Sequence, residues 1–197
     1  MTDPFILVLT GSIGMGKSTT AAMFADIGIP VWDADAAVEE LYASGGSAVA
    51  PVGQLAPQAI RNGAIDKALL RDEIAKVPTL LNKVEQIVHP LVAEHRNAFL
   101  EAAKAADIVV LDIPLFFESK SHPDADAVLV VSATPEVQRD RVLGRGKMDE
   151  ATFEMILSRQ VPDADKRASA DYVIETLTLE DTRRKVEALV TMIRASL

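Results

Sequence analysis

The sequence predicts an α/β fold in three layers, with helices on both sides of a five-stranded parallel sheet. Three observations lead to this prediction. Short apolar runs alternate with segments of helical periodicity along the 197 residues, a pattern typical of parallel strands joined by helices. The first apolar run leads into a glycine-rich loop, and a helix follows that loop. Two later apolar runs end at Asp33 and Asp112, which places acidic side chains where parallel strands end.

The N-terminal elements set this pattern. Phe5–Leu9 is apolar throughout, as expected for a strand that is buried on both faces. The following helix covers Lys17–Ile27 and ends at Gly28, because glycine readily adopts the left-handed conformation that closes a helix. A short strand is expected at Val31-Trp32, and a helix follows from about Ala36 to Ala43.

Residues 44–90 are expected to form an all-helical insert. One helical segment covers Lys67–Lys76 and another covers Pro78–Val88. The second should stop at His89-Pro90, because proline lacks the N–H that a helix interior needs. A separate helix then runs from about Leu91 to Ala105. We therefore expect a single domain over residues 1–197, with a core at 1–43 and 106–197 and a candidate substrate-binding insert at about 44–105.

The C-terminal half returns to alternating strands and helices. Its last helix carries an apolar stripe of Val186, Leu189, Val190 and Ile193, and this spacing buries one helix face. Strands are expected at Ile108–Leu111, Ala127–Val131 and Tyr172–Ile174, and helices at about Pro135–Gly144, Asp149–Gln160 and Leu179–Ala195.

Composition narrows the class of protein. The net charge of −9 disfavours nucleic acid as a partner, because nucleic-acid binders carry a basic face. The apolar runs are too short to cross a bilayer, and Met1–Pro4 has no basic start of a signal peptide. With no cysteine, the chain has no disulfides or thiolate sites. We expect a soluble cytoplasmic protein that does not bind membranes, a monomer or a weak homo-oligomer.

The glycine-rich loop carries the strongest functional signal. Its sequence matches the phosphate-binding pattern G-x-x-x-x-G-K-S/T, and it lies between a strand and a helix as the pattern requires. Glycines let several backbone N–H groups point into one concavity, and the helix N-terminus adds positive charge. Lys17 can then reach the β- and γ-phosphates, and the Ser18 hydroxyl can bind Mg²⁺. The loop comprises Gly11, Ser12, Ile13, Gly14, Met15, Gly16, Lys17 and Ser18, and Thr19 follows it.

Two aspartates are expected at the same edge of the sheet as this loop. Asp112 follows a buried strand, where P-loop enzymes place the acidic residue that helps to hold Mg²⁺. A strand-end turn is the structural alternative. Asp33 can accept the proton of a substrate hydroxyl in phosphoryl transfer, or can cap the following helix. Asp35 is better placed as that cap, which leaves Asp33 available as the base.

A basic cluster in this acidic chain is a candidate lid over a triphosphate. Arg141 and Arg145 are four residues apart and share a helix face, and Gly144 and Gly146 flank Arg145. Such a lid, at about 139–160, would neutralise developing charge and exclude water. The alternative is an exposed helix face with ordinary ion pairs, which is favoured for Arg139 and Lys147.

The quoted motifs also resemble a known family. The chain is similar to dephospho-CoA kinases over nearly its whole length. The resemblance rests on residues 9–19, Asp33-Ala34-Asp35, His89-Pro90, residues 111–118 (L-D-I-P-L-F-F-E), Gln138, Arg141, Arg145, Gln160 and residues 166–174 (K-R-A-S-A-D-Y-V-I).

The resemblance implies transfer of phosphate from ATP to the ribose 3′-hydroxyl of dephospho-CoA, giving CoA and ADP, with Mg²⁺ as cofactor. Asp33 would be the base, Lys17 and Arg141 would act on the phosphates, and Arg145 would contact ATP. The acceptor site would include Asp33, His89, Asp112, Pro114, Leu115 and Phe117.

Two positions depart from the family pattern. Thr176 stands where the family often has Asn, and Ile156 stands where it often has Arg, with Arg159 nearby. A kinase for another acceptor, such as a nucleoside monophosphate, is the alternative among enzymes. A nucleotide-dependent switch is less favoured, because the D-x-x-G and N-K-x-D signals of GTPases are absent.

Overall fold

The computed structural model describes residues 3–119, 123–146 and 148–197. Their contacts divide the chain into two compact units. The first comprises Met1–Trp32 and Ala103–Leu197, and the second comprises Asp33–Ala102. No helix among the described residues is long and apolar enough to cross a membrane.

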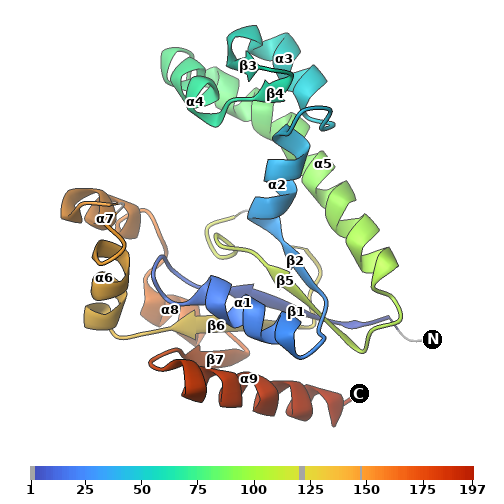
Figure 1. Cartoon of the computed structure of the whole chain (residues 1–197), viewed down its shortest axis with the longest axis vertical. Coiled ribbons are helices and arrows are strands. Elements are labelled where there is room, and N and C mark those ends of the chain that lie inside the picture. The colour runs from blue at the N-terminus through green and yellow to red at the C-terminus, as the bar shows by residue number, and fades with distance from the viewer. Residues whose placement is uncertain (1–2, 120–122, 147) are drawn as a thin grey trace. The chain divides into compact units, whose positions relative to one another are not determined.

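The first unit is built on a five-stranded sheet with the order β2-β5-β1-β6-β7 (Figure 1). Strand β1 pairs in parallel with β5 and β6, and β6 pairs in parallel with β7. The predicted α/β fold with a five-stranded parallel sheet is therefore confirmed. The strands are β1 Phe5–Thr10, β2 Val31–Asp33, β5 Ile108–Asp112, β6 Ala127–Ser132 and β7 Tyr172–Glu175.

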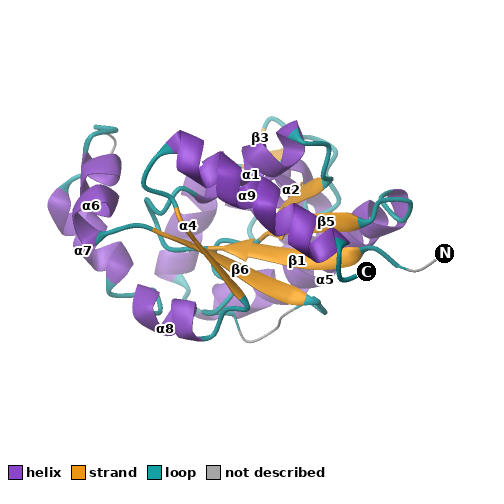
Figure 2. Ribbon diagram, turned by 90° about the horizontal axis from the view of Figure 1, so that it is seen from below, coloured by secondary structure: helices purple, strands orange, loops and turns teal. Residues whose placement is uncertain are grey.

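Helices α1 and α9 pack on one face of this sheet, and Figure 2 shows α8 on the other. The predicted stripe of α9 is buried, and it packs with Met23 and Phe24 of α1 against the inward side chains of the strands. The helices of the unit are α1 Lys17–Asp26, α6 Pro135–Leu143, α7 Glu150–Leu157, α8 Asp163–Ala168 and α9 Leu179–Arg194.

The second unit has its own apolar core. Side chains of its helices, among them Leu41, Val52, Leu70 and Val84, form one buried cluster. Its elements are α2 Ala34–Tyr42, α3 Val49–Leu55, the 3-10 helix Pro57–Ala59, β3 Ile60–Arg61, β4 Ala64–Ile65, α4 Lys67–Lys76 and α5 Thr79–Ala102.

The prediction of helices alone in this segment is wrong. Strands β3 and β4 form an antiparallel hairpin, and its two-residue turn is Asn62-Gly63. Both turn residues have positive φ, 53° and 76°, as the tightest hairpin turns require. Asn-Gly is a strong local signal for such a turn, so the sequence carried the information.

The predicted break at His89-Pro90 is also wrong, because α5 continues through Pro90. Proline removes one helical hydrogen bond and crowds the preceding turn. Packing overrides this cost: Val84 and Val88 before the proline and Leu91 and Val92 after it all contact the same apolar cluster. Tertiary contacts therefore keep the two halves in one helix.

Replacing Pro90 tests this balance. Pro90→Ala restores the N–H that the carbonyl of Gln86 lacks, so we expect the free energy of unfolding to rise by about 1–2 kcal/mol after the entropy gain of the unfolded chain is subtracted. Chemical denaturation measures the change. A fall in stability would contradict this expectation.

Candidate active site

The phosphate loop has the backbone that its glycines permit. Gly14 and Gly16 have φ of 78° and 88°, values that side chains disfavour. Gly16 is the N-cap of α1, which begins at Lys17. Among the described residues, no backbone acceptor is found for the N–H groups of Gly14, Gly16 and Lys17. These donors and the helix N-terminus suit an anion.

Side chains from distant segments hold the loop from outside. The N–H of Ile13 donates to Oε1 of Gln160 (3.2 Å), and Nε2 of Gln138 donates to the carbonyl of Ile13 (2.7 Å). The hydroxyl of Thr176 donates to the carbonyl of Met15 (2.8 Å). The N–H of Ala133 donates to the Met15 thioether (3.0 Å).

Lys17 and Asp112 meet at the carboxyl end of the central strands. The register places Leu9 beside Asp112, so β5 ends where β1 enters the phosphate loop. The Nζ of Lys17 lies 2.5 Å from Oδ1 of Asp112, whose side chain is almost fully buried. A buried carboxylate needs such a partner, and this pair puts a cation and an anion beside the loop.

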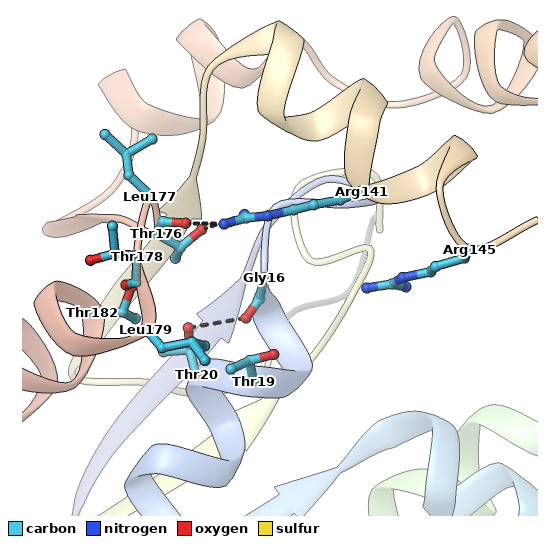
Figure 3. A pocket seen from close by; sticks show the side chains of 10 residues that line it. All are labelled: Gly16, Thr19, Thr20, Arg141, Arg145, Thr176, Leu177, Thr178, Leu179 and Thr182. Atoms are coloured by element: carbon cyan, nitrogen blue, oxygen red, sulfur yellow. Dashed lines mark hydrogen bonds between the residues drawn. The ribbon is translucent and has the colours of Figure 1, made fainter.

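A cavity of about 300 Å³ opens beside the phosphate loop. Figure 3 shows Arg141 and Arg145 extending from α6 and the turn after it toward Gly16 and Thr176. Arg141 donates through Nη1 to the hydroxyl of Thr176 (3.0 Å) and through Nη2 to the Thr176 carbonyl. The cavity is lined by Gly16, Thr19, Thr20, Arg141, Arg145, Thr176, Leu177, Thr178, Leu179 and Thr182.

Arg139, the other described member of the basic cluster, does not line this cavity. Arg139 forms an ion pair with Glu150 at the surface, as the structural alternative predicts, and Lys147 lies outside the described residues. Carboxylates lie at the start of both α6 and α7. Hydrogen bonds with Thr152 lower the pKa of Asp149, which caps α7. The pKa of Glu136 in α6 is lowered by its own backbone N–H and by Thr134.

The segment after β5 combines an exposed end with a buried one. Leu115 is half exposed, the carbonyl of Pro114 accepts a bond from Thr10, and the rings of Phe116 and Phe117 meet edge to face at 5.4 Å. Glu118 points inward: its Oε1 lies 2.8 Å from Nζ of Lys166, which is fully buried.

Asp33 and His89 belong to the second unit. Asp33 is the N-cap of α2, and its Oδ1 accepts from the N–H groups of Asp35 (2.8 Å) and Ala36 (3.0 Å). The expectation that Asp35 would be the cap is wrong, because the helix begins at Ala34, two residues earlier than expected. His89 is exposed on α5.

Comparison with known proteins agrees with this geometry. A family model described as dephospho-CoA kinase matches residues 5–181. The chain belongs to the dephospho-CoA kinase family. A relative described as dephospho-CoA kinase from Cereibacter sphaeroides is 59% identical over 191 residues, covering 97% of this chain and 96% of the relative.

Solved structures support the same fold. The protein TT1252 from Thermus thermophilus has a TM-score of 0.83 at 31% identity, with 97% of this chain and 98% of that chain covered. Dephospho-CoA kinase from Campylobacter jejuni has a TM-score of 0.65 at 19% identity, with 98% of both chains covered; at this identity it supports the fold alone. The family is one of phosphotransferases in CoA biosynthesis that use ATP and dephospho-CoA.

Sequence patterns missed several residues of the site. Thr176 was noted only as a departure from the family, yet its hydroxyl links Arg141 to the phosphate loop. Gln138 and Gln160 were noted only as shared residues, yet both bind Ile13. Sequence spacing gives no signal for such contacts, because the partners are more than a hundred residues apart.

Gly16→Ala tests whether the loop requires its glycine. A Cβ at Gly16 would lie 2.8 Å from the Thr176 hydroxyl at a φ of 88°, and such strain costs on the order of 1–3 kcal/mol. We expect ATP affinity to fall about ten- to hundredfold, measured by calorimetry. Gly28→Ala is the matched control, because Gly28 has a φ of 82° and open space around it; it should keep ATP affinity. Equal losses in both variants would contradict a specific role for Gly16.

Proposed function

We propose that the chain transfers the γ-phosphate of ATP to the ribose 3′-hydroxyl of dephospho-CoA, with the Gly11–Ser18 loop holding the phosphates. The observation that carries this proposal is the cavity beside the loop, where Arg141, Arg145 and Gly16 converge. Membership of the dephospho-CoA kinase family supports the acceptor. Phosphoryl transfer depends mainly on positioning and on stabilising spread negative charge, and this arrangement offers both.

The phosphate contacts divide between backbone and side chains. The N–H groups of the loop and the first turn of α1 hold oxygens of the β- and γ-phosphates. Lys17 bridges them, since its ammonium has three donors and Asp112 uses only one. Arg141 and Arg145 neutralise charge that develops on the transferred group. The nucleoside lies in the cavity against Thr178 and Leu179.

Mg²⁺ fits the oxygen donors at this point. It favours one or two protein oxygens together with substrate phosphates and water. Asp112 supplies a buried carboxylate, and Ser18 supplies a hydroxyl in the first turn of α1. No cluster of three metal-binding side chains occurs in the described ranges, so these residues suit a metal that arrives with ATP. Bound Mg²⁺ would neutralise phosphate charge.

Asp33 is proposed as the base. Its Oδ1 caps α2, and no residue in the part of the chain that the structure describes donates a hydrogen bond to its Oδ2. The cap fixes the rotamer of the carboxylate. Oδ2 can therefore accept the proton of the attacking hydroxyl.

In the first unit, Asp112 and the segment after β5, with Pro114, Leu115 and Phe117, are proposed to contact the acceptor. From the family resemblance, Asp33 and His89 are proposed as the acceptor residues of the second unit. Exposure of Leu115 provides apolar surface for such a contact. We propose that the enzyme works as a monomer or weak homo-oligomer.

Asp33→Asn separates the base from the cap. Asn keeps an oxygen that can cap α2, but it cannot accept the proton, so we expect kcat to fall on the order of 10²-fold or more while ATP affinity stays near wild type. A coupled ADP assay and calorimetry measure the two. Asp35→Asn, an exposed neighbour on the same helix, should leave kcat unchanged. Unchanged turnover in Asp33→Asn would remove Asp33 from the base role.

Acceptor dependence tests the reaction itself. The rate of ADP release should rise at least about tenfold when dephospho-CoA is added, because a correctly positioned acceptor accelerates the transfer by at least this factor. Nucleoside monophosphates should not replace dephospho-CoA. The coupled assay should be run with dephospho-CoA, AMP and CMP in parallel. ADP release that ignores every acceptor would indicate a hydrolysing switch instead.

A further inference from the structure

We propose that Gln138 and Gln160 are positioning residues, which set the shape of the phosphate loop by binding the two backbone polar groups of Ile13. The proposal rests on the function proposed for the loop. Oε1 of Gln160 accepts from the Ile13 N–H at 3.2 Å, and Nε2 of Gln138 donates to the Ile13 carbonyl at 2.7 Å. One residue of the loop is thus held from both sides.

The two hydrogen bonds with Gln138 and Gln160 satisfy backbone groups of the loop that would otherwise have no partner. The loop lies outside the ladders of helix and sheet, so its polar groups require side chains or water as partners. An amide side chain offers a donor and an acceptor without adding charge. A carboxylate at either position would put a negative charge beside the site of the phosphates, and an ammonium could only donate. Two glutamines therefore suit one orphan donor and one orphan acceptor.

Gln138 also couples the loop to the arginine that faces it. Gln138 is buried in α6, one turn before Arg141. A Cβ built at Gly14 would lie 2.6 Å from Cγ2 of Val142 and 3.0 Å from the carbonyl of Gln138. Loop and helix are in direct contact at this point, so the bond to Ile13 fixes the position of the phosphate loop relative to α6, which carries Arg141.

Gln160 is held in turn by its neighbours. The N–H of Val161 donates to Oε1 of Glu118 (2.9 Å), and Nζ of Lys166 lies 2.8 Å from the same oxygen without the alignment of a hydrogen bond. Lys166 is fully buried, and a buried ammonium has to keep its counter-ion. This ion pair therefore fixes the segment that presents Gln160 to the loop.

The test replaces each glutamine by methionine, which keeps the length of the side chain but not its hydrogen bonds. For Gln138→Met and Gln160→Met we expect KM for ATP to rise about tenfold and kcat to fall about tenfold, as small misplacements in a site do. KM for dephospho-CoA should stay within about twofold of wild type. The double variant should lose less than the sum of the single variants, because both side chains act on Ile13.

Gln54→Met is the matched control, since Gln54 is exposed near the end of α3; it should match wild type. Thermal unfolding identifies a merely structural role: a lowered melting temperature with unchanged kinetic constants would overturn the proposal, and so would equal rises in KM for both substrates. Wild-type enzyme without acceptor-dependent ADP release would instead refute the proposed function, which separates the two failures.

Discussion

The site depends on a phosphate loop whose backbone lacks the regular hydrogen bonds of a helix or a sheet. Between β1 and α1 the chain must present its N–H groups inward, and this leaves its outward groups to be satisfied by other segments. Ile13 and Met15 take partners from α6, from the segment after α7 and from the ends of β6 and β7. The parallel register brings these segments to one edge of the sheet, so fold and site are set by the same strands.

Only a few charged side chains surround the phosphate loop among the described residues. Lys17 and Asp112 form an ion pair at the end of the central strands, and Arg141 and Arg145 line the cavity beside the loop. The whole chain carries a net charge of −9, so attraction of an anionic substrate has to come from this local concentration of cations.

Much of the fold follows from local sequence patterns, because hydrophobic periodicity and glycine punctuation record which faces are buried. The five strands, the phosphate loop and the stripe of α9 were predicted in this way. The hairpin at Asn62-Gly63 was missed although its signal is local. The continuity of α5 and the two glutamines that bind Ile13 depend on partners distant in sequence, and no local pattern reports such contacts. The cap of α2 was assigned to Asp35 instead of Asp33 because the predicted start of the helix was two residues too late, and helix boundaries are the least reliable part of such a prediction.

Thr176 restricts how this sequence can change. Its hydroxyl donates to Met15, accepts from Arg141 and would stand 2.8 Å from any Cβ at Gly16. The residue at 176 must therefore be short and must both donate and accept a hydrogen bond. A bulkier side chain at position 176 would therefore have to turn away from Gly16.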